Sequence, residues 1–150
     1  MSKVGAALLA GGVAIVLNSA ALAAADWVPL ATAHGGLLRL LVMLSGGALK
    51  VPSGSAFQLF FHGVVGLAMA LFYAWLLEPR MSGPAWRRGA YYGVFAWLAN
   101  ALIVLPATGE GFAGSRHLTL AGMWWFAAAH MLFFVLQAVL YARFRRVFLT

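Results

Sequence analysis

The sequence contains no cysteine among its 150 residues. This absence excludes disulfides, thiolate metal sites, iron–sulfur clusters and cysteine nucleophiles. Acidic residues are scarce as well, because Asp26, Glu78 and Glu110 are the only three in the chain. None of them falls inside a long apolar segment, so no such segment can hold paired catalytic carboxylates or a carboxylate-based metal site.

Charged residues of all kinds make up only 9% of the chain, whereas 64% of its residues are hydrophobic. Soluble domains are usually about half apolar and about a quarter charged, so this composition is typical of a membrane protein. The formal charge of +7 does not indicate nucleic-acid binding, because the Lys and Arg residues are scattered between apolar segments without forming a basic face. We therefore expect the partner of this surface to be the lipid bilayer and not a nucleic acid.

Four apolar stretches are long enough to cross a hydrocarbon core of roughly 30 Å as helices. They cover about residues 4–25, 56–77, 89–105 and 120–141. Short connections with Pro and Gly follow the second and third stretches, and they favour antiparallel neighbours. The sequence therefore predicts an all-α fold, an integral membrane four-helix bundle that forms a single transmembrane domain over residues 1–150.

The first connection, over residues 26–55, is longer than the others and contains an apolar run at 35–49 that Arg39 interrupts. This run is too short to span a bilayer, so we expect a short interfacial or re-entrant helix between the first two spans. Lys3, the apolar run after it and the small residues before Asp26 also resemble a cleavable signal peptide, which would leave three spans. We interpret this segment as an uncleaved first helix.

Lysine and arginine are distributed unevenly between the two sides that four spans create. The side with both termini and the second connection holds seven of them, and the opposite side holds three. The positive-inside rule then predicts that both termini of this multi-pass membrane protein are cytoplasmic. Aromatic residues near the predicted helix ends fit an interfacial belt: Trp27, Trp75, Trp86, Trp124 and Tyr141.

Polar side chains inside the predicted spans are the first candidates for a site, because they are costly in hydrocarbon. One such residue from each span reaches the outer half of the bundle if each residue rises about 1.5 Å. These ligand-binding candidates are Asn18, His62, Asn100 and His130, with Gln137 and Tyr73 as supporting residues. Small residues share their helical faces, which predicts that these faces point inward. Two interpretations stay open, interhelical hydrogen bonds alone or a ligand site.

Haem b is the most specific cofactor hypothesis, because two imidazoles on facing helices can hold iron axially. His62 and His130 would be the iron ligands, although their expected depths differ by about 6 Å. A mononuclear metal site of another kind lacks a third strong ligand. A second candidate group lies in the outer loop, where we expect Glu110 to pair with Arg116 and His117 to be solvated near the start of the fourth helix.

Several short motifs are spread along the chain. They are Phe61-His62-Gly63 with Gly66; Arg88-Gly89 with Gly93, Trp97 and Asn100; Leu105-Pro106; the loop 109–116; and Ala129-His130. In these residues the chain resembles an uncharacterised family of small four-helix bacterial inner-membrane proteins, defined by a domain of unknown function. The resemblance implies a four-helix fold and an inner-membrane location, and it implies no known activity. A second similarity, in size, helix count and an Asn after a Trp, is to small haem-containing membrane isomerases acting on epoxides.

No nucleophile elbow or phosphate-binding loop occurs in the sequence. We therefore expect a non-catalytic accessory or assembly subunit of a larger membrane complex, such as a respiratory enzyme. Aromatic side chains expected on the helix surfaces would contact other subunits, further copies of the chain or lipid: Trp97, Trp124, Trp125, Phe126 and Phe133. The alternative is a haem- or small-ligand-binding protein or enzyme that uses His62 and His130. A small transporter or channel is the third hypothesis, against which the lack of charged residues within the spans and of repeat symmetry argues.

Overall fold

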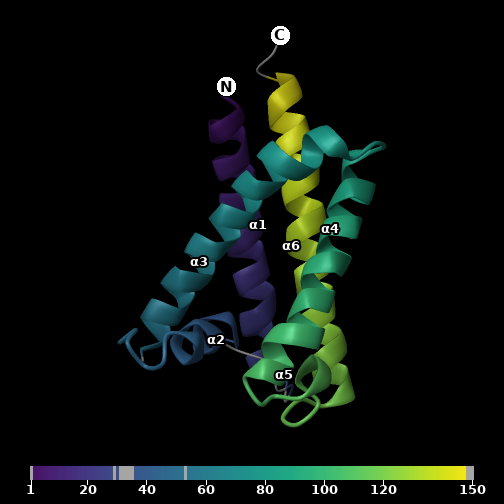
Figure 1. The fold of residues 1–150 in the computed structure, drawn as a ribbon. Coiled ribbons are helices and arrows are strands. Elements are labelled where there is room, and N and C mark those ends of the chain that lie inside the picture. The colour runs from purple at the N-terminus through teal and green to yellow at the C-terminus, as the bar shows by residue number, and fades with distance from the viewer. Residues whose placement is uncertain (1, 29, 31–35, 53, 148–150) are drawn as a thin grey trace.

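The computed structural model describes residues 2–28, 30, 36–52 and 54–147 (Figure 1). These residues form helices and loops, with no β-strand among them. Four helices are long and apolar enough to cross a membrane: Lys3–Ala25, Ser55–Arg80, Ala85–Ala107 and Leu120–Arg146. The prediction of four apolar spans in an all-α chain is confirmed. The third span begins four residues earlier than predicted, directly after Pro84, which is its N-cap residue.

The first and last long helices begin at capping hydroxyls. Ser2 Oγ accepts a hydrogen bond from the backbone N–H of Gly5 at 3.0 Å, at the start of α1 (Lys3–Ala24). Thr119 Oγ1 accepts from the backbone N–H of Gly122 at 3.1 Å, directly before α6 (Leu120–Val147). Each hydroxyl satisfies one of the backbone donors that the first turn of a helix leaves without a partner. The sequence thus sets these two boundaries locally.

The other two long helices, α3 (Ser55–Phe72) and α4 (Ala85–Ala99), are continued by π-helical segments. Segment Tyr73–Leu77 and a 3-10 turn, Glu78–Arg80, follow α3. Segment Asn100–Val104 leads from α4 into the short α5 (Leu105–Ala107). Single π-helical turns are rare inside helices and frequently occur at functional sites. Here each of them begins at a polar residue that was a candidate for the site.

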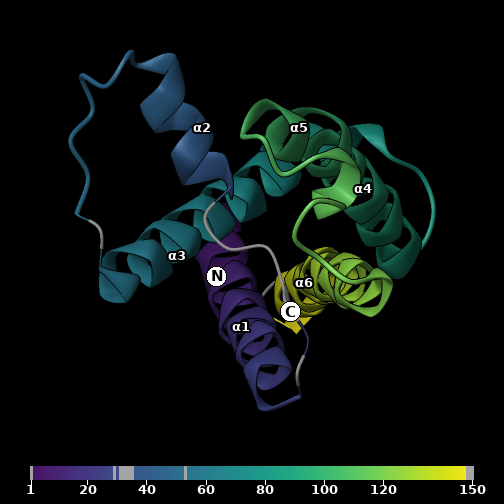
Figure 2. The ribbon, with the colours of Figure 1, turned by 90° about the horizontal axis from the view of Figure 1, so that it is seen from below.

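The long helices are not packed as a symmetric bundle. Helix α6 packs along both α1 and α4, and α1 packs against α3. Seen along the bundle in Figure 2, α6 lies between α1 and α4 while α3 crosses on the other side of α1. Helices α3 and α4 meet at their connection and diverge away from it (Figure 1). We call the end that holds both termini and this connection the terminal end, and the opposite end the loop end.

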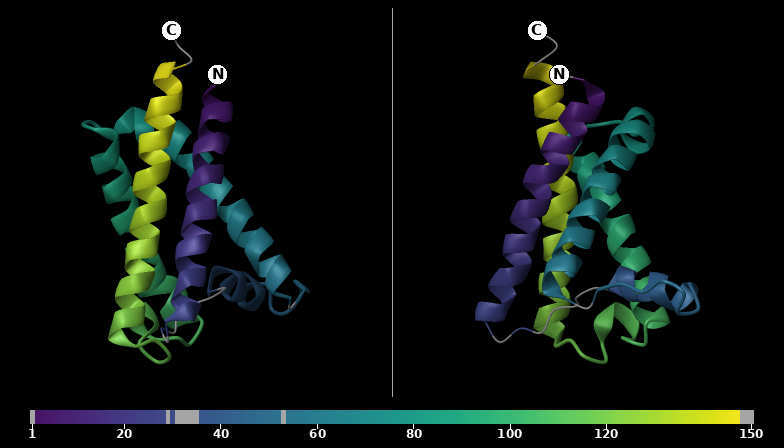
Figure 3. Two further views of the ribbon diagram at one scale, coloured as in Figure 1. Left: turned by 180° about the vertical axis from the view of Figure 1, so that it is seen from behind. Right: turned by 90° about the vertical axis from the view of Figure 1, so that its left-hand side faces the viewer.

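A short helix, α2 (Gly36–Leu44), lies at the loop end and runs across the long helices (Figure 3). It ends before Gly46 and Gly47, whose φ angles are +62° and +81°. Glycine adopts this left-handed conformation without the penalty of a Cβ atom, and it commonly ends helices in this way. The predicted apolar helix therefore stops several residues before position 49, and Gly35 lies outside the described residues.

Close helix contacts depend on glycine at two interfaces. A Cβ atom on Gly89 would lie 2.5 Å from the carbonyl oxygen of Phe134 and 2.8 Å from Cα of Val135, where α4 meets α6. A Cβ atom on Gly66 would lie 2.6 Å from Cδ1 of Ile15, where α3 meets α1. Small residues thus face neighbouring helices, as the sequence pattern predicts.

The expected surface position of two aromatic side chains is wrong. Phe126 is only 6% exposed and Phe133 only 4%, because α6 has helices on two sides and turns these rings toward them. The indole Nε1–H of Trp125 donates to the carbonyl oxygen of Ala21 at 2.9 Å. Trp124, by contrast, is 71% exposed and lies on the surface as predicted.

Candidate functional site

The first polar pair inside the bundle joins three helices. His62 Nε2–H on α3 donates to Asn18 Oδ1 on α1 at 3.0 Å. The amide nitrogen of Asn18 donates in turn to the carbonyl oxygen of Ala129 on α6 at 2.6 Å. Asn18 is buried, with 4% of its surface exposed. One amide side chain therefore ties α1 to both α3 and α6 at the same level.

The second pair joins α4 to α6. Asn100 Nδ2 donates to His130 Nε2 at 3.3 Å, and His130 Nδ1–H donates to the carbonyl oxygen of Phe126 at 2.9 Å. A carbonyl oxygen only accepts and an amide nitrogen only donates. His130 is therefore a neutral imidazole with its proton on Nδ1. The ring of Phe126 packs edge-on against it, with centroids 4.4 Å apart.

The two pairs adjoin, because Ala129 and His130 are consecutive residues of α6. The imidazoles are near enough for a charge on His62 to act on His130. We call these four residues (Asn18, His62, Asn100 and His130) the Asn–His layer. The structure brings together one polar residue from each long helix, which is the convergence that the depth argument predicts. A ligand-binding role for the layer stays a prediction.

One acceptor atom of the layer, the side-chain oxygen of Asn100, lacks a hydrogen-bond donor among the described residues. Asn100 Oδ1 is buried and accepts no hydrogen bond from any residue that the structure describes. A buried acceptor without a donor costs on the order of 1–3 kcal/mol. This oxygen lies at the start of the π-helical segment Asn100–Val104, so it is the point of the layer at which a hydrogen-bond donor from outside would be stabilised.

The geometry of the layer does not suit a haem held by both histidines. Axial ligation requires a ring nitrogen whose lone pair points at the iron. His130 Nε2 accepts from Asn100, and His62 Nε2 carries the proton that it donates to Asn18. Because His130 Nδ1 carries the proton that it donates to Phe126, the Asn100–His130 bond would have to break before His130 could ligate iron. Among the residues that the structure describes, no group of three or more His, Asp or Glu side chains could hold a metal ion.

The two supporting candidates, Tyr73 and Gln137, lie at a different level. Gln137 follows His130 by seven residues, which is about 10 Å toward the terminal end. Tyr73 stacks on Tyr92 with centroids 6.1 Å apart and meets Tyr141 edge-on at 6.0 Å. Its place near a predicted helix end suggests that Tyr141 belongs to the interfacial belt. This prediction is wrong, because Tyr141 is only 2% exposed. These residues form a second polar level, which lies between the Asn–His layer and the terminal end.

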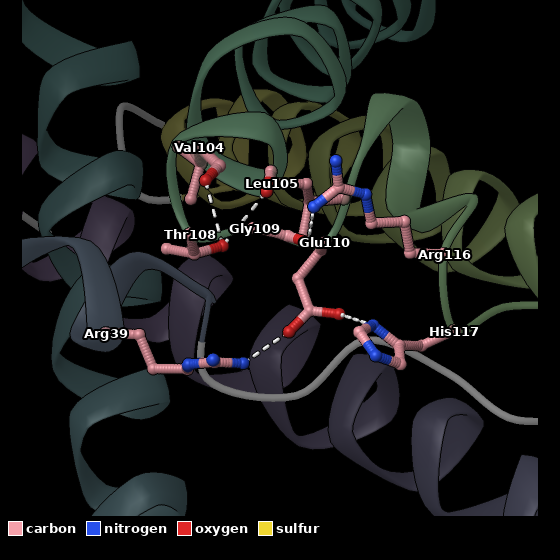
Figure 4. A network of polar contacts seen from close by, with 8 residues as sticks. All are labelled: Arg39, Val104, Leu105, Thr108, Gly109, Glu110, Arg116 and His117. Atoms are coloured by element: carbon pink, nitrogen blue, oxygen red, sulfur yellow. Dashed lines mark hydrogen bonds and ion pairs between the residues drawn. The ribbon is translucent and has the colours of Figure 1, made fainter.

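The outer-loop candidates form a network around one carboxylate (Figure 4). Glu110 accepts hydrogen bonds from Arg39 of α2 and from His117 Nδ1, the latter at 2.5 Å. The expected pairing of Glu110 with Arg116 is wrong, because Arg116 turns back and donates to the carbonyl oxygen of Gly109 at 3.1 Å. Arg39 lies 71 residues before Glu110, so sequence proximity gives no signal for this contact.

The charge of Glu110 is favoured by its neighbours. Partial burial acts to raise the pKa of Glu110, but the hydrogen bonds and positive charges of His117 and Arg39 outweigh burial and hold the pKa below its ordinary value. Only 17% of the Glu110 side chain is exposed, against 57% for Arg39 and 65% for His117. The network therefore joins α2 to the loop before α6 and serves as a clamp.

Comparison of this chain with protein-family models, with curated proteins and with solved structures gives no match. The resemblance to an uncharacterised four-helix family, which rests on the motifs above, stays a prediction. Functional inference for this chain therefore begins from its own contacts.

Proposed function

We propose that this chain is an integral membrane subunit without catalysis of its own, which acts as an accessory or assembly component of a larger membrane complex. The observation that carries this proposal is the use of the intramembrane polar residues as mutual partners. Asn18, His62, Asn100 and His130 bond to one another and to backbone carbonyls. Such interhelical bonds contribute about 0.6 kcal/mol each, and they fix helix position more than they supply chemistry.

An unpartnered helix face supports the same proposal. Helices α3 and α4 diverge toward the loop end (Figure 1). Each of them carries large apolar side chains that the chain itself leaves exposed. Phe60 on α3 is 66% exposed and Phe95 on α4 is 69% exposed. In a membrane, lipid or another transmembrane helix covers such surfaces. We propose that a helix of another subunit covers these exposed side chains of α3 and α4.

The proposed setting is the bacterial inner membrane, with both termini and the α3–α4 connection in the cytoplasm. The excess of Lys and Arg at the terminal end supports this orientation. Helix α2 would then lie along the outer interface, where Leu38 is buried against the chain and Arg39 reaches Glu110. Because the chain contains no cysteine, single cysteines in the two loops can be labelled from either side to test the orientation without background.

The partner proposal is tested by purification in mild detergent after crosslinking in the membrane. We expect a stable companion protein that is lost when Phe60 and Phe95 are both replaced by Ala. Val16→Ala is the control, since Val16 is as exposed as Phe60, at 66%, but belongs to α1. Recovery of a homogeneous homomer, or equal loss of the companion in both variants, would count decisively against this function.

Ligand binding by the Asn–His layer is the second candidate, because Asn100 Oδ1 is a buried acceptor that no described residue satisfies. A small molecule with a hydrogen-bond donor would complete the layer. Native mass spectrometry of the purified protein, with Asn100→Leu as the variant, distinguishes this from the scaffold role. An absorption spectrum tests the haem hypothesis directly, and a colourless preparation ends it.

A further inference from the structure

Three buried side chains near the terminal end carry polar atoms that no described residue satisfies. Tyr73, at the start of its π-helical segment, and Gln137 are each 1% exposed, and Tyr141 is 2% exposed. The unsatisfied atoms are the two tyrosine hydroxyls and both amide atoms of Gln137. Buried polar side-chain atoms in native proteins nearly always have a partner, either in the protein or in ordered water. We call these three residues the Tyr–Gln cluster.

The members of the cluster are neighbours in space. The rings of Tyr73 and Tyr141 meet edge-on with centroids 6.0 Å apart. Gln137 precedes Tyr141 by one turn on the same face of α6. Alanines take part in the core that surrounds the tyrosines, including Ala7, Ala10 and Ala138. The methyl groups of these alanines cannot form hydrogen bonds with the polar atoms of the cluster.

An ion pair connects the cluster with the terminal end of the bundle. Arg88 Nη1 donates to the carbonyl oxygen of Glu78 at 3.3 Å and to its carboxylate at 3.4 Å. The Glu78 side chain is 32% exposed and that of Arg88 is 15% exposed. Arg88 Nε is buried and is a further donor without a described acceptor. Glu78 directly follows the π-helical segment Tyr73–Leu77, which begins at Tyr73.

A layer of aromatic rings bounds the Tyr–Gln cluster on the side away from the terminal end. Phe133 and Phe134 pack against each other at 4.9 Å between centroids, and Tyr92 packs edge-on against Phe134 at 4.4 Å. The hydroxyl of Tyr92 donates to the carbonyl oxygen of Met69 and is therefore satisfied. This layer separates the Tyr–Gln cluster from the Asn–His layer, so the series of unsatisfied atoms runs from the ion pair to Gln137 and ends there.

We propose that the Tyr–Gln cluster binds water within the membrane-spanning bundle, and that the water enters from the terminal end beside the Glu78–Arg88 pair. A buried water makes about three hydrogen bonds to groups that are otherwise unsatisfied. Hydroxyls, an amide and a guanidinium N–H supply both donors and acceptors, which matches water. An apolar ligand would leave all these atoms without partners, and an anion would meet an arginine that is already paired with Glu78.

The direct test is a density map of the unmodified protein in lipid at a resolution that resolves water, roughly 2 Å. We expect a peak within hydrogen-bond distance, about 3 Å, of at least two of the atoms Tyr73 Oη, Tyr141 Oη and the Gln137 amide. Direct contact between the Gln137 amide and a tyrosine hydroxyl, with no such peak, overturns the proposal. A peak too large for water, which another ligand would produce, overturns it as well.

A chemical test uses two cysteine variants of the cysteine-free chain, Gln137→Cys and Phe134→Cys. The two positions are similarly buried, at 1% and 2% exposure. A thiol must ionise to react with the small neutral reagent methyl methanethiosulfonate, and a dry environment raises its pKa. A cavity lined by polar groups takes up water, whereas one lined by aromatic rings stays dry. We expect the cysteine at 137 to react at least about tenfold faster, the effect of one pKa unit.

A triple variant excludes the charge of Arg88 as the cause of a fast reaction. In Gln137→Cys combined with Tyr73→Phe and Tyr141→Phe, the hydroxyls are gone while Arg88 remains. We expect its rate to fall to that of Phe134→Cys. Equal rates for the two single variants, or a triple variant that remains fast, overturn the proposal. If the variants do not fold, the density map of the unmodified chain still decides it.

Discussion

Replacing Gly89 by Ala is expected to separate α4 from α6 and to destabilise the bundle. The added Cβ would lie 2.5 Å from the carbonyl oxygen of Phe134 and 2.8 Å from Cα of Val135. Both are backbone atoms, so no side-chain rotation relieves the clash and one helix must move. Overpacking of this kind typically costs about 1–3 kcal/mol.

The substitution also has a favourable effect, which sets the size of the net change. Alanine in a helix interior is favoured over glycine by up to about 1 kcal/mol. Gly63→Ala on α3 isolates this gain, because no atom lies within 4 Å of the Cβ position at residue 63. We therefore expect Gly63→Ala to be neutral or stabilising, and Gly89→Ala to be destabilised by up to about 2 kcal/mol relative to the unmodified chain.

Thermal unfolding in detergent, followed by circular dichroism, measures both variants under the same conditions. For a chain of this size, 1 kcal/mol shifts Tm by about 2–4 °C, so Gly89→Ala should unfold up to about 8 °C below the unmodified protein. Size-exclusion chromatography before heating confirms that each variant is folded. A Tm for Gly89→Ala equal to or above that of Gly63→Ala would refute the close approach of α4 and α6 at this position.

Two further predictions concern the polar contacts. At neutral pH, Glu110→Gln should speed amide hydrogen exchange in α2, residues 36–44. The change should correspond to at most about 1 kcal/mol, since both partners of Glu110 are largely exposed. The control variant Arg116→Gln should leave exchange in α2 unchanged. Because the pKa of Glu110 is lowered in the folded protein, its stabilisation of α2 is complete above the unfolded-state pKa and is lost as pH falls through the folded-state value. The protection factor of α2, which is corrected for the intrinsic pH dependence of amide exchange, should therefore fall in acid for the unmodified chain and not for Glu110→Gln, and a fall of equal size in both would exclude the clamp. Asn18→Leu breaks two interhelical bonds and should lower Tm by an amount equivalent to about 1–2 kcal/mol, whereas Val16→Ala, on the outer face of α1, should change it little.

The fold class of this chain follows from the sequence alone. Hydropathy is a property of each residue and adds along the chain, so 20 or so apolar residues in a row predict a span whatever surrounds them. Faces rich in small residues are predicted in the same way, because the helical repeat places Gly89 and Gly93 on one side of their helix. The inward placement of Asn18, His62, Asn100 and His130 could be predicted from the sequence for this reason.

Which partner each polar group meets was decided by the tertiary structure. Asn18 bonds to His62 and Asn100 to His130, and Tyr73 and Gln137 belong to another level, because helix crossing and the two π-helical segments set the rotation and height of each side chain. Arg39 reaches Glu110 only because α2 lies across the loop end. Such contacts join residues far apart in the chain, and their geometry depends on the packing of several helices at once, which no local pattern encodes.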